Sequence, residues 1–245
     1  SQFDNAPADI RKIARNVDVR DYRANALPTL SMPEPPEVVD DGGLQQLRFK
    51  VVEAQRSGKL RQFGGKVRFS KAVWWSLGEE LASGIVDYAA TVFSAIETRL
   101  IAERLEGGTV TTVASSGLGE TGLNNAAEAM REQLNSAGQR SNLAIGSIIV
   151  PSKLEMTARK LRQDLGWSDL NIVVNAWLSS DTSWFALCNP AISAPLLRLQ
   201  MRGAGIPRVC DNARESGPET GMSFAVEHAV DFVLATAPGL IKATA

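Results

Sequence analysis

The sequence has few of the side chains on which enzymes and metal sites most often depend. Among its 245 residues it holds a single histidine, His228, and two cysteines, Cys188 and Cys210. One histidine excludes a site with several histidine ligands and removes the most common general base. Two cysteines without a spacing pattern exclude a disulfide framework and a cysteine zinc site, and they favour a reducing compartment.

The chain also lacks long apolar runs and a strong charge of either sign. No stretch of about 18 apolar residues occurs and no charged-then-apolar leader opens the chain, so the sequence predicts neither a membrane span nor a secretory signal. A formal net charge of −1 excludes a uniformly basic nucleic-acid binder. Because 44% of the residues are hydrophobic, we expect a soluble protein with one or two globular domains.

Catalytic motifs are scarce as well, since no GxSxG, HExxH, Walker or EF-hand spacing occurs. Gly117–Gly122 satisfies the spacing GxGxxG, but a dinucleotide site also needs a buried strand before the glycines and a carboxylate that closes the next strand. The segment before the glycines is polar, and the next strand ends at Val150 and Pro151. We therefore expect a glycine loop, and no catalytic residue, cofactor or metal. The patterns around His228 and Cys188 predict buried side chains, with His228 in the core or at an interface.

The most regular feature that is present is a helical pattern over residues 74–108. Apolar side chains recur at helical spacing, and Gly107 and Gly108 can end a helix in a left-handed turn. The stripe consists of Leu81, Ile85, Tyr88, Val92 and Ile96, widened by Val86, Ala89, Phe93 and Leu100. We expect one long amphipathic helix, with Leu81, Ile85, Val92, Phe93 and Ile96 buried against the β-sheet of the same chain.

Residues 1–43 do not have the pattern of a compact domain. Residues 1–23 are polar with scattered hydrophobics, and Pro28, Pro33, Pro35 and Pro36 then force extended or polyproline backbone. Two interpretations remain open: a disordered tail, or an arm that lies along a neighbouring surface. The chain begins with Ser1 rather than methionine, which numbering, initiator removal or proteolytic maturation would each explain.

Residues 44–73 contain two β-rich runs on either side of a turn at residues 56–59, which predicts a long β-hairpin. Its basic residues are Arg48, Lys50, Arg56, Lys59, Arg61, Lys66, Arg68 and Lys71, against Glu53 alone. The segment before it carries Glu34, Glu37, Asp40 and Asp41 and no positive charge. Because a two-stranded hairpin is barely stable alone, we expect it to lie on another copy of the molecule. A solvated hairpin with a basic edge is the alternative.

The rest of the chain mixes helical and strand patterns. After a polar, β-branched segment over 109–117, we predict helices over 121–138 and 152–166 and strands over 142–150, 171–178, 184–190 and 195–203. A polar loop follows over 203–221 and a last strand over 222–236. The expected inward faces are Leu123, Ala127, Met130, Leu134 and Ala137 of the first helix and Phe224, Val226, His228, Val230, Phe232 and Leu234 of the last strand. The fold class is α+β.

The order of these parts resembles that of the HK97-fold major capsid proteins of tailed bacteriophages, in their mature form. The resemblance is carried by the acidic, proline-rich residues 30–37, the run 69–71 into the helix, the strand-proline-helix unit 148–155, the strand 184–190 and the segment 229–242. It implies an N-terminal arm over 1–43, an extended β-hairpin loop over 44–73, a peripheral domain with a spine helix over 74–138 and about 203–245, and an axial domain over 139–202. In this family a prohead protease commonly removes an N-terminal segment, which would account for Ser1.

The resemblance also implies a function. It indicates a structural protein, not an enzyme, which self-assembles into the hexamers and pentamers of an icosahedral shell around double-stranded DNA. The implied partners are further copies of the chain, portal and decoration proteins and a prohead protease, without a membrane. The implied location is the virion, after assembly in the bacterial cytoplasm. Two alternatives remain: an encapsulin-like nanocompartment shell, and more distantly a dinucleotide-binding enzyme through Gly117–Gly122.

The charges of the arm and the hairpin suggest how subunits meet. We predict contacts between subunits at the basic residues Arg48, Lys50, Lys59, Lys66, Arg68 and Lys71 and the acidic residues Glu34, Glu37, Asp40 and Asp41. Lys59 and Asn212 are available for the lysine–asparagine crosslink that some members of the family form, but we do not predict one.

Overall fold

A computed structural model describes residues 10–23, 25–30, 51–69, 71–114, 117–134, 138–202, 208–211, 222–235 and 238–244. The elements are α1 (Ile10–Ile13), β1 (Arg15–Val19), β2 (Asn25–Leu30), β3 (Val51–Gly58), β4 (Arg61–Phe69), α2 (Lys71–Gly107), β5 (Thr111–Ala114), α3 (Glu120–Glu132), β6 (Ile145–Val150), the 3-10 turn η2 (Ser152–Leu154), α4 (Glu155–Asp164), β7 (Asn171–Val174), β8 (Trp184–Cys188), β9 (Leu196–Met201), β10 (Arg208–Asp211), β11 (Met222–Leu234) and β12 (Leu240–Thr244). This mixture of helices and strands confirms the α+β class.

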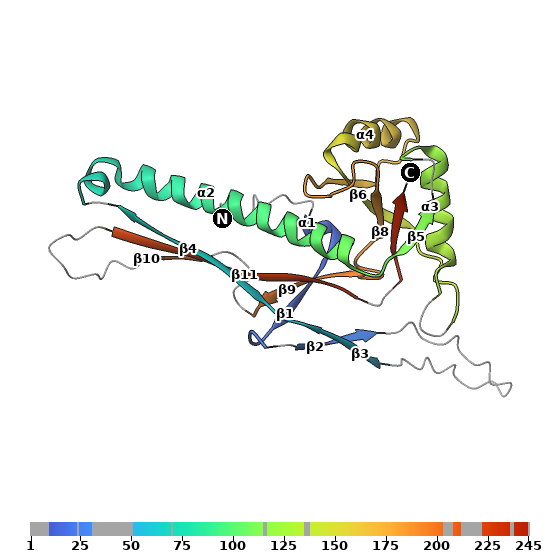
Figure 1. Ribbon diagram of the computed structural model, residues 1–245, viewed down its shortest axis with the longest axis horizontal. Coiled ribbons are helices and arrows are strands. Elements are labelled where there is room, and N and C mark those ends of the chain that lie inside the picture. The colour runs from blue at the N-terminus through green and yellow to red at the C-terminus, as the bar shows by residue number, and fades with distance from the viewer. Residues whose placement is uncertain are drawn as a thin grey trace, which may run out of the picture.

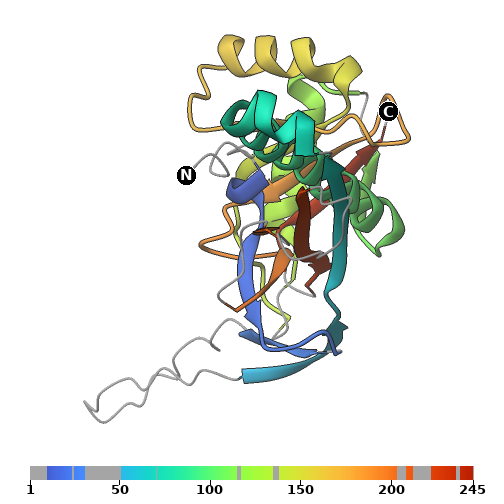
Figure 2. The same cartoon turned by 90° about the vertical axis from the view of Figure 1, so that its left-hand side faces the viewer.

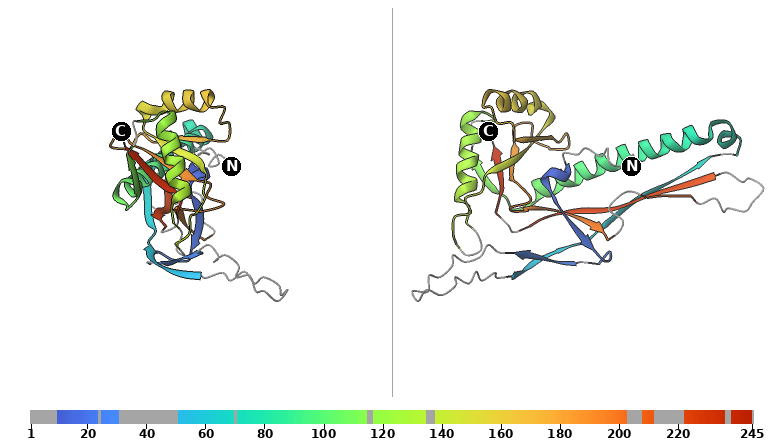
Figure 3. Two further views of the ribbon diagram at one scale, coloured as in Figure 1. Left: turned by 90° about the vertical axis from the view of Figure 1, so that its right-hand side faces the viewer. Right: turned by 180° about the vertical axis from the view of Figure 1, so that it is seen from behind.

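The strands form two sheets of five strands and a separate pair, which Figure 1 shows in their places. In the first sheet β11 is central: β9 and β10 pair with one of its sides, β4 pairs with the other, and β1 continues beyond β9. The second sheet has the order β5-β12-β8-β6-β7. Helix α2 runs along the first sheet and ends beside the second, which carries α3 and α4 (Figures 1 and 2). The pair β2-β3 lies apart from both sheets (Figure 3).

Helix α2 is the long helix that the sequence predicts. It begins at Lys71, three residues before the predicted start, and its 37 residues span about 55 Å. The structure confirms that Phe93 is buried and that Ile96 packs against the core, whereas Val92 is partly exposed. The side chains of Leu81 and Ile85 lie outside the described part of the chain.

The buried face of α2 differs in part from the predicted stripe. The prediction that Tyr88 belongs to the buried stripe is wrong, since Tyr88 is 73% exposed. Glu97 is buried instead. The true face runs through Ala89, Phe93, Glu97, Leu100, Ile101 and Leu105. This face lies one residue beyond the Tyr88–Val92–Ile96 row. The sequence pattern does not show it clearly, because the charged residue Glu97 lies in the middle of the face and interrupts the apolar spacing.

The prediction that the two strands around residues 56–59 pair as a hairpin is wrong. In the described chain β3 pairs antiparallel with β2, and β4 pairs antiparallel with β11 along its whole length. Leu60, between β3 and β4, is 3% exposed and packs with Val19, Leu197 and Leu199. The expected hairpin tip is therefore anchored in the body, and the two-stranded ribbon is β2-β3, formed by residues 25–30 and 51–58.

Gly64 helps β4 to join the first sheet. A Cβ atom built on Gly64 would lie 3.1 Å from the carbonyl oxygen of Val226 on β11, closer than an ordinary van der Waals contact. Glycine allows the two backbones to come this near. In β2, Pro28 has no N–H to donate to the ladder, and the pairing with β3 shifts register between Ala26 and Pro28.

Residues 13–19 belong to the body of the protein and not to an arm or a tail. Strand β1 pairs in parallel with β9, and Ile13, Ala14 and Val19 are at most 4% exposed. The prediction that residues 1–43 lie outside the compact body is therefore wrong for residues 13–19. The few apolar side chains of these residues are buried because neighbouring elements cover them.

The remaining elements mostly agree with the sequence. Helix α4 and strands β6, β7, β8, β9 and β11 lie within the predicted ranges, and α3 begins one residue before its predicted start. Helix α3 ends at Glu132, earlier than predicted, and Leu134 beyond it is 62% exposed instead of buried. Strand β10 lies in the predicted loop 203–221, and β12 was not predicted as a strand of its own.

The core is divided by the second sheet. On one face of that sheet, Leu100, Ile101 and Leu105 of α2 pack with residues from both sheets, among them Phe185 and Phe232. On the other face, α3 and α4 pack over β6, β8 and β12 around Trp184. The last turns of α2 therefore pack against both sheets and join them.

Candidate functional site

The charged side chains that hold α2 against the first sheet form a polar site in the described part of the chain. They fall into two groups along the helix, one inside the protein and one at its rim. We call Glu97, Arg198 and His228 the buried cluster, and Arg61, Glu103, Arg104 and Asp231 the rim cluster. In each group, α2 supplies side chains that meet residues of the sheet, so both groups determine how the helix sits.

The buried cluster joins α2, β9 and β11. Nη2 of Arg198 donates to Oε1 of Glu97 at 2.6 Å, and Nε of Arg198 donates to Oε2 at 3.2 Å. Nε2 of His228 lies 2.8 Å from Oε1 of the same carboxylate. Arg198 also donates to Gln200, which in turn donates to Asp18 of β1. One carboxylate thus receives hydrogen bonds from two strands.

The surroundings of Glu97 act on its pKa in opposite directions. Burial of the carboxyl group is the largest single influence and raises the pKa, since a charged group is less stable away from water. The hydrogen bonds from His228 and Arg198, with the attraction of the Arg198 charge, together outweigh burial and hold the pKa of Glu97 below its ordinary value. Glu97 is therefore an ionised side chain that is 8% exposed.

The rim cluster lies further along α2. Nη2 of Arg104 donates to Oδ2 of Asp231 at 2.9 Å, and Arg61 of β4 makes a longer contact of 3.4 Å with the same oxygen. Arg61 also donates to both carboxylate oxygens of Glu103, at 3.1 and 3.2 Å. The side chain of Asp231 is 3% exposed, but those of Arg61, Arg104 and Glu103 are 36%, 36% and 52% exposed. Water therefore reaches most of this cluster.

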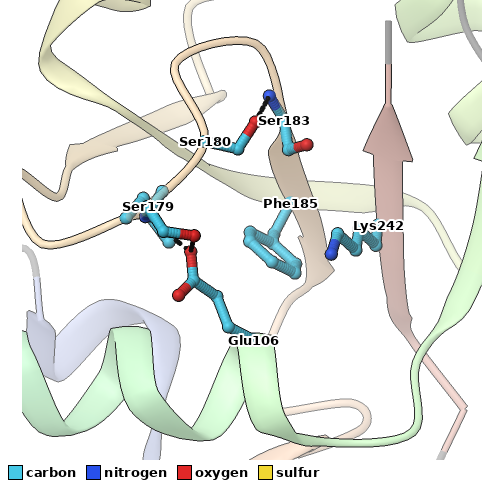
Figure 4. Close-up of a pocket in the computed structure, with 7 residues that line it drawn as sticks. Glu106, Ser179, Ser180, Ser183, Phe185 and Lys242 are labelled. Carbon is cyan, nitrogen blue, oxygen red and sulfur yellow. Dashed lines mark hydrogen bonds between the residues drawn. The ribbon is translucent and has the colours of Figure 1, made fainter.

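A third contact fastens the end of α2 to the second sheet's unit. Oε1 of Glu106 accepts hydrogen bonds from the backbone N–H of Ser179 at 2.7 Å and from its hydroxyl at 2.8 Å. Figure 4 shows these groups around a shallow pocket that Ser180, Ser183, Phe185 and Lys242 also line. Nζ of Lys242 lies 5.8 Å from the ring centroid of Phe185. Glu106, at this pocket, therefore holds the loop that contains Ser179.

Within the described ranges, no group of three or more His, Cys, Asp or Glu side chains is placed to hold a metal ion. Cys188 is buried, and burial raises the pKa of its thiol to about 11, so the thiolate nucleophile is scarce near neutral pH. No helix of the described chain is both long and apolar enough to cross a membrane.

The glycine segment 117–122 has a structural explanation in the described chain. Gly117 has a positive φ of 93°, which favours glycine, and Gly119 is the residue before the first turn of α3. The preceding strand, β5, pairs in parallel with β12 at one edge of the sheet. Leu118 is buried in the core next to α3. The segment thus connects a strand to a helix, as the sequence predicts.

The predicted contact residues are only partly within the described chain. Lys59 is exposed at the junction of β3 and β4, beside a surface hollow that Glu103, Arg104 and Asp231 also line. Lys66 and Arg68 lie in β4, in register with Ala225 and Ser223 of β11, and Lys71 is the first residue of α2. The other predicted residues lie outside the described ranges: Glu34, Glu37, Asp40, Asp41, Arg48 and Lys50.

The partners of His228 were not among the residues predicted from the sequence. The sequence predicted a buried histidine in the core or at an interface, and His228 is 2% exposed. Glu97 and Arg198 were not singled out, although both are charged residues inside otherwise apolar patterns. One feature of the sequence could have indicated them: each is a charged residue at a position that the helical or strand period assigns to the core.

Comparisons with known proteins agree on one kind of protein. A family model described as "Phage capsid protein" matches residues 53–240. Among solved structures, the virus-like particle of Pyrococcus furiosus is 12% identical with a TM-score of 0.64, and the match covers 99% of this chain and 96% of that chain. A search of curated proteins finds no match.

Two further solved structures show how widely the fold is shared. The chain in the head structure of Helicobacter pylori bacteriophage KHP40 is 10% identical with a TM-score of 0.63, over 94% of this chain and 85% of that chain. The SrpI encapsulin of Synechococcus elongatus PCC 7942 is 9% identical with a TM-score of 0.61, over 97% and 87%. At such identities the similarity shows the fold alone.

Proposed function

This chain belongs to the phage capsid protein family, and on that premise we propose that its copies form the hexamers and pentamers of an icosahedral shell around double-stranded DNA. The subunit has the HK97-like capsid fold, and it is a major capsid protein whose place is the capsid of the virion. The single observation that carries the function is the family match over residues 53–240. As a structural protein it needs no catalytic residue, and we propose none.

The ribbon β2-β3 supports contacts between copies. Its two strands pair with each other and with no other strand of the described chain. A pair of strands is marginally stable by itself, and an unpaired edge invites pairing or packing with another chain. We propose that the ribbon lies on a neighbouring subunit, which adds buried area between subunits without enlarging the core of either one.

The pairing of the strands also moves the proposed domain boundaries. We propose that residues 13–19 contribute to the body and that the extended loop contains β2 and β3. The peripheral domain then contains β4, α2 and the first sheet, while the axial domain contains the second sheet with α3 and α4. The mutual pairing of β2 and β3, and of β4 with β11, supports this division.

Charge complementarity between subunits remains a proposal for the basic and acidic residues named from the sequence. We expect that Lys66→Glu with Arg68→Glu leaves a folded subunit that fails to assemble, because like charges would then meet across the contact. The matched control is Lys66→Gln with Arg68→Gln, which removes the charges without reversing them and should weaken assembly less. Circular dichroism checks folding, and electron microscopy counts shells.

A compensating variant makes this test sharper. Because every copy carries both surfaces, adding Glu34→Lys and Glu37→Lys to the Lys66→Glu, Arg68→Glu chain should restore assembly if the two segments meet. Normal shells from the charge-reversed chain would refute the electrostatic contact. A folded quadruple variant without shells would show that Glu34 and Glu37 are not the partners.

The contents of the particle distinguish a capsid from an encapsulin-like compartment, the second candidate, which the similarity to SrpI encapsulin supports. We propose a packaged genome, with portal and decoration proteins and a prohead protease as further partners and assembly in the host bacterial cytoplasm; the family supports each of these. Purified particles should contain nuclease-protected double-stranded DNA. Particles filled with protein cargo and free of nucleic acid would favour the compartment.

A further inference from the structure

His228 is a buried titratable group that the function of a shell subunit does not by itself require. It is the only histidine of the chain, it lies within β11, and it is 2% exposed. The ring of Phe93 covers it with a centroid distance of 5.2 Å. An imidazole is the side chain that ordinarily changes charge between about pH 5 and 8, so its position against α2 matters.

The hydrogen bonds determine which nitrogen of His228 carries the proton. An ionised carboxylate can only accept, so Nε2 donates its hydrogen to Oε1 of Glu97 across 2.8 Å. In the neutral imidazole, Nδ1 is then a bare acceptor. This atom is buried and has no hydrogen-bond partner among the described residues.

The only position at which His228 can bind a second proton is therefore unfavourable. This proton binds Nδ1 and produces a buried N–H donor that faces no described acceptor. It also changes the buried cluster from one negative and one positive charge to one negative and two positive charges. An unpaired donor and an uncompensated charge are both costly away from water, and both costs disappear when the group becomes hydrated.

Few charged groups lie near His228 on the described elements that pack around it. Helix α2 presents Glu97 and strand β9 presents Arg198, while Phe63 of β4 is in register with His228 itself. On β11 the preceding residue, Glu227, is exposed and in register with Arg208 of β10. Asp18 of β1 reaches the cluster only through Gln200 and Arg198. Glu97 is thus the one acid that His228 contacts directly among the described groups.

We propose that the buried cluster is a proton-operated latch: uptake of a proton at Nδ1 of His228 loosens α2 from β11. When His228 is neutral, its Nε2–H and Arg198 hold the carboxylate of Glu97, and the helix is closed on the sheet. When His228 is charged, water must reach Nδ1, and the part of α2 around Phe93 and Glu97 separates from the strand. In an assembled shell the same proton uptake acts on every subunit.

The test uses hydrogen exchange on the full chain, with His228→Gln as the non-titrating variant. Glutamine keeps an N–H donor for Glu97 and has no proton to gain. From pH 8 to 5.5, after correction for intrinsic exchange, the wild-type amides of residues 93–105 should lose protection by up to about tenfold per pH unit, because one proton is taken up. The variant should show no such pH dependence. Equal pH profiles for both chains would overturn the latch.

A second measurement on the unmodified chain covers the case in which His228→Gln does not fold. Because the chain has one histidine, its imidazole nitrogen signals in NMR are assigned without ambiguity. They should show the Nε2–H form at pH 8, and on acidification they should shift together with the amides of Phe93 and Glu97. An imidazole that gains its proton while those amides stay unchanged contradicts the latch. Neither result depends on whether the shell contains DNA, so this test and that of the proposed function can fail separately.

Discussion

Two groups of charged side chains hold α2 on the same sheet, and they differ in how much water reaches them. In the buried cluster the side chains of Arg198, Glu97 and His228 are at most 10% exposed, whereas in the rim cluster Glu103 is 52% exposed. Water can replace a lost partner at the rim but not inside. Similar ion pairs therefore stabilise one helix very unequally along its length.

The largest expected effect comes from Arg198→Met. The substitution leaves the carboxylate of Glu97 buried with His228 as its remaining side-chain donor in the buried cluster, and an uncompensated buried charge costs about 3–5 kcal/mol. We expect the free energy of unfolding in urea at pH 7 to fall by that amount, with both chains in the same assembly state. Differential scanning calorimetry should show a lower Tm as well.

The control for this prediction is the double variant Glu97→Gln with Arg198→Met. It removes both charges and keeps an oxygen that can accept from His228, so it should be clearly more stable than Arg198→Met alone. If the double variant loses as much unfolding free energy as the two single variants together, the two charges act independently. The buried cluster would then not differ from the rim cluster in the way that burial predicts.

The sequence predicted the frame around these clusters well. The helix α2, most of the strands and the α+β class follow from periodicity, because burial of one face repeats at a fixed spacing. The partner of β3 could not be predicted this way. Alternation shows that a segment is a strand but not which strand it joins, and Leu60, which anchors the junction with β4, is one residue in a turn-like stretch.

The charged clusters were harder to predict for a physical reason. Glu97 and Arg198 are far apart in the sequence, and their residue types are usually found at the surface. Only the fold places them together and removes the water that would otherwise make the pair weak. The burial of His228 could be predicted from its apolar neighbours, but its hydrogen-bond partner could not.

The next expected effect is that of Asp231→Asn in the rim cluster. Asp231 is itself buried and receives hydrogen bonds from Arg104 and Arg61, but the two arginines are partly hydrated and can turn to water. After the substitution, the side-chain oxygen at position 231 can still accept the hydrogen bond from the backbone N–H of Phe232. We expect a loss of about 1.5–3 kcal/mol in urea unfolding, the range for hydrogen bonds to a charged group. A loss above that of Arg198→Met would contradict the assigned order.

Acid should reveal the buried carboxylate separately. Since the pKa of Glu97 is lower in the folded chain than its ordinary value of 4.5, its stabilising effect is fully present above about pH 4.5. It is lost as the pH falls through the folded pKa, at no more than about 1.4 kcal/mol per pH unit. Unfolding measured from pH 5.5 to 3 should show a stability gap between wild type and Glu97→Gln that narrows with acid. Glu103 titrates in both chains, so a gap of constant size would show that Glu97 does not contribute.

The smallest expected effect is that of Glu103→Gln, although its geometry looks favourable. Arg61 donates to both oxygens of Glu103, and this hydrogen bonding lowers the carboxyl pKa, but the carboxylate is half exposed and the pair is screened by solvent. We expect a loss of about 0.2–1 kcal/mol at low salt and almost none in about 1 M salt, where the screening length is roughly 3 Å. The loss from Arg198→Met should hardly change with salt, because ions do not reach that site. If both losses depended on salt alike, water would reach the two clusters equally, and burial could not be what makes one of them hold the helix more strongly than the other.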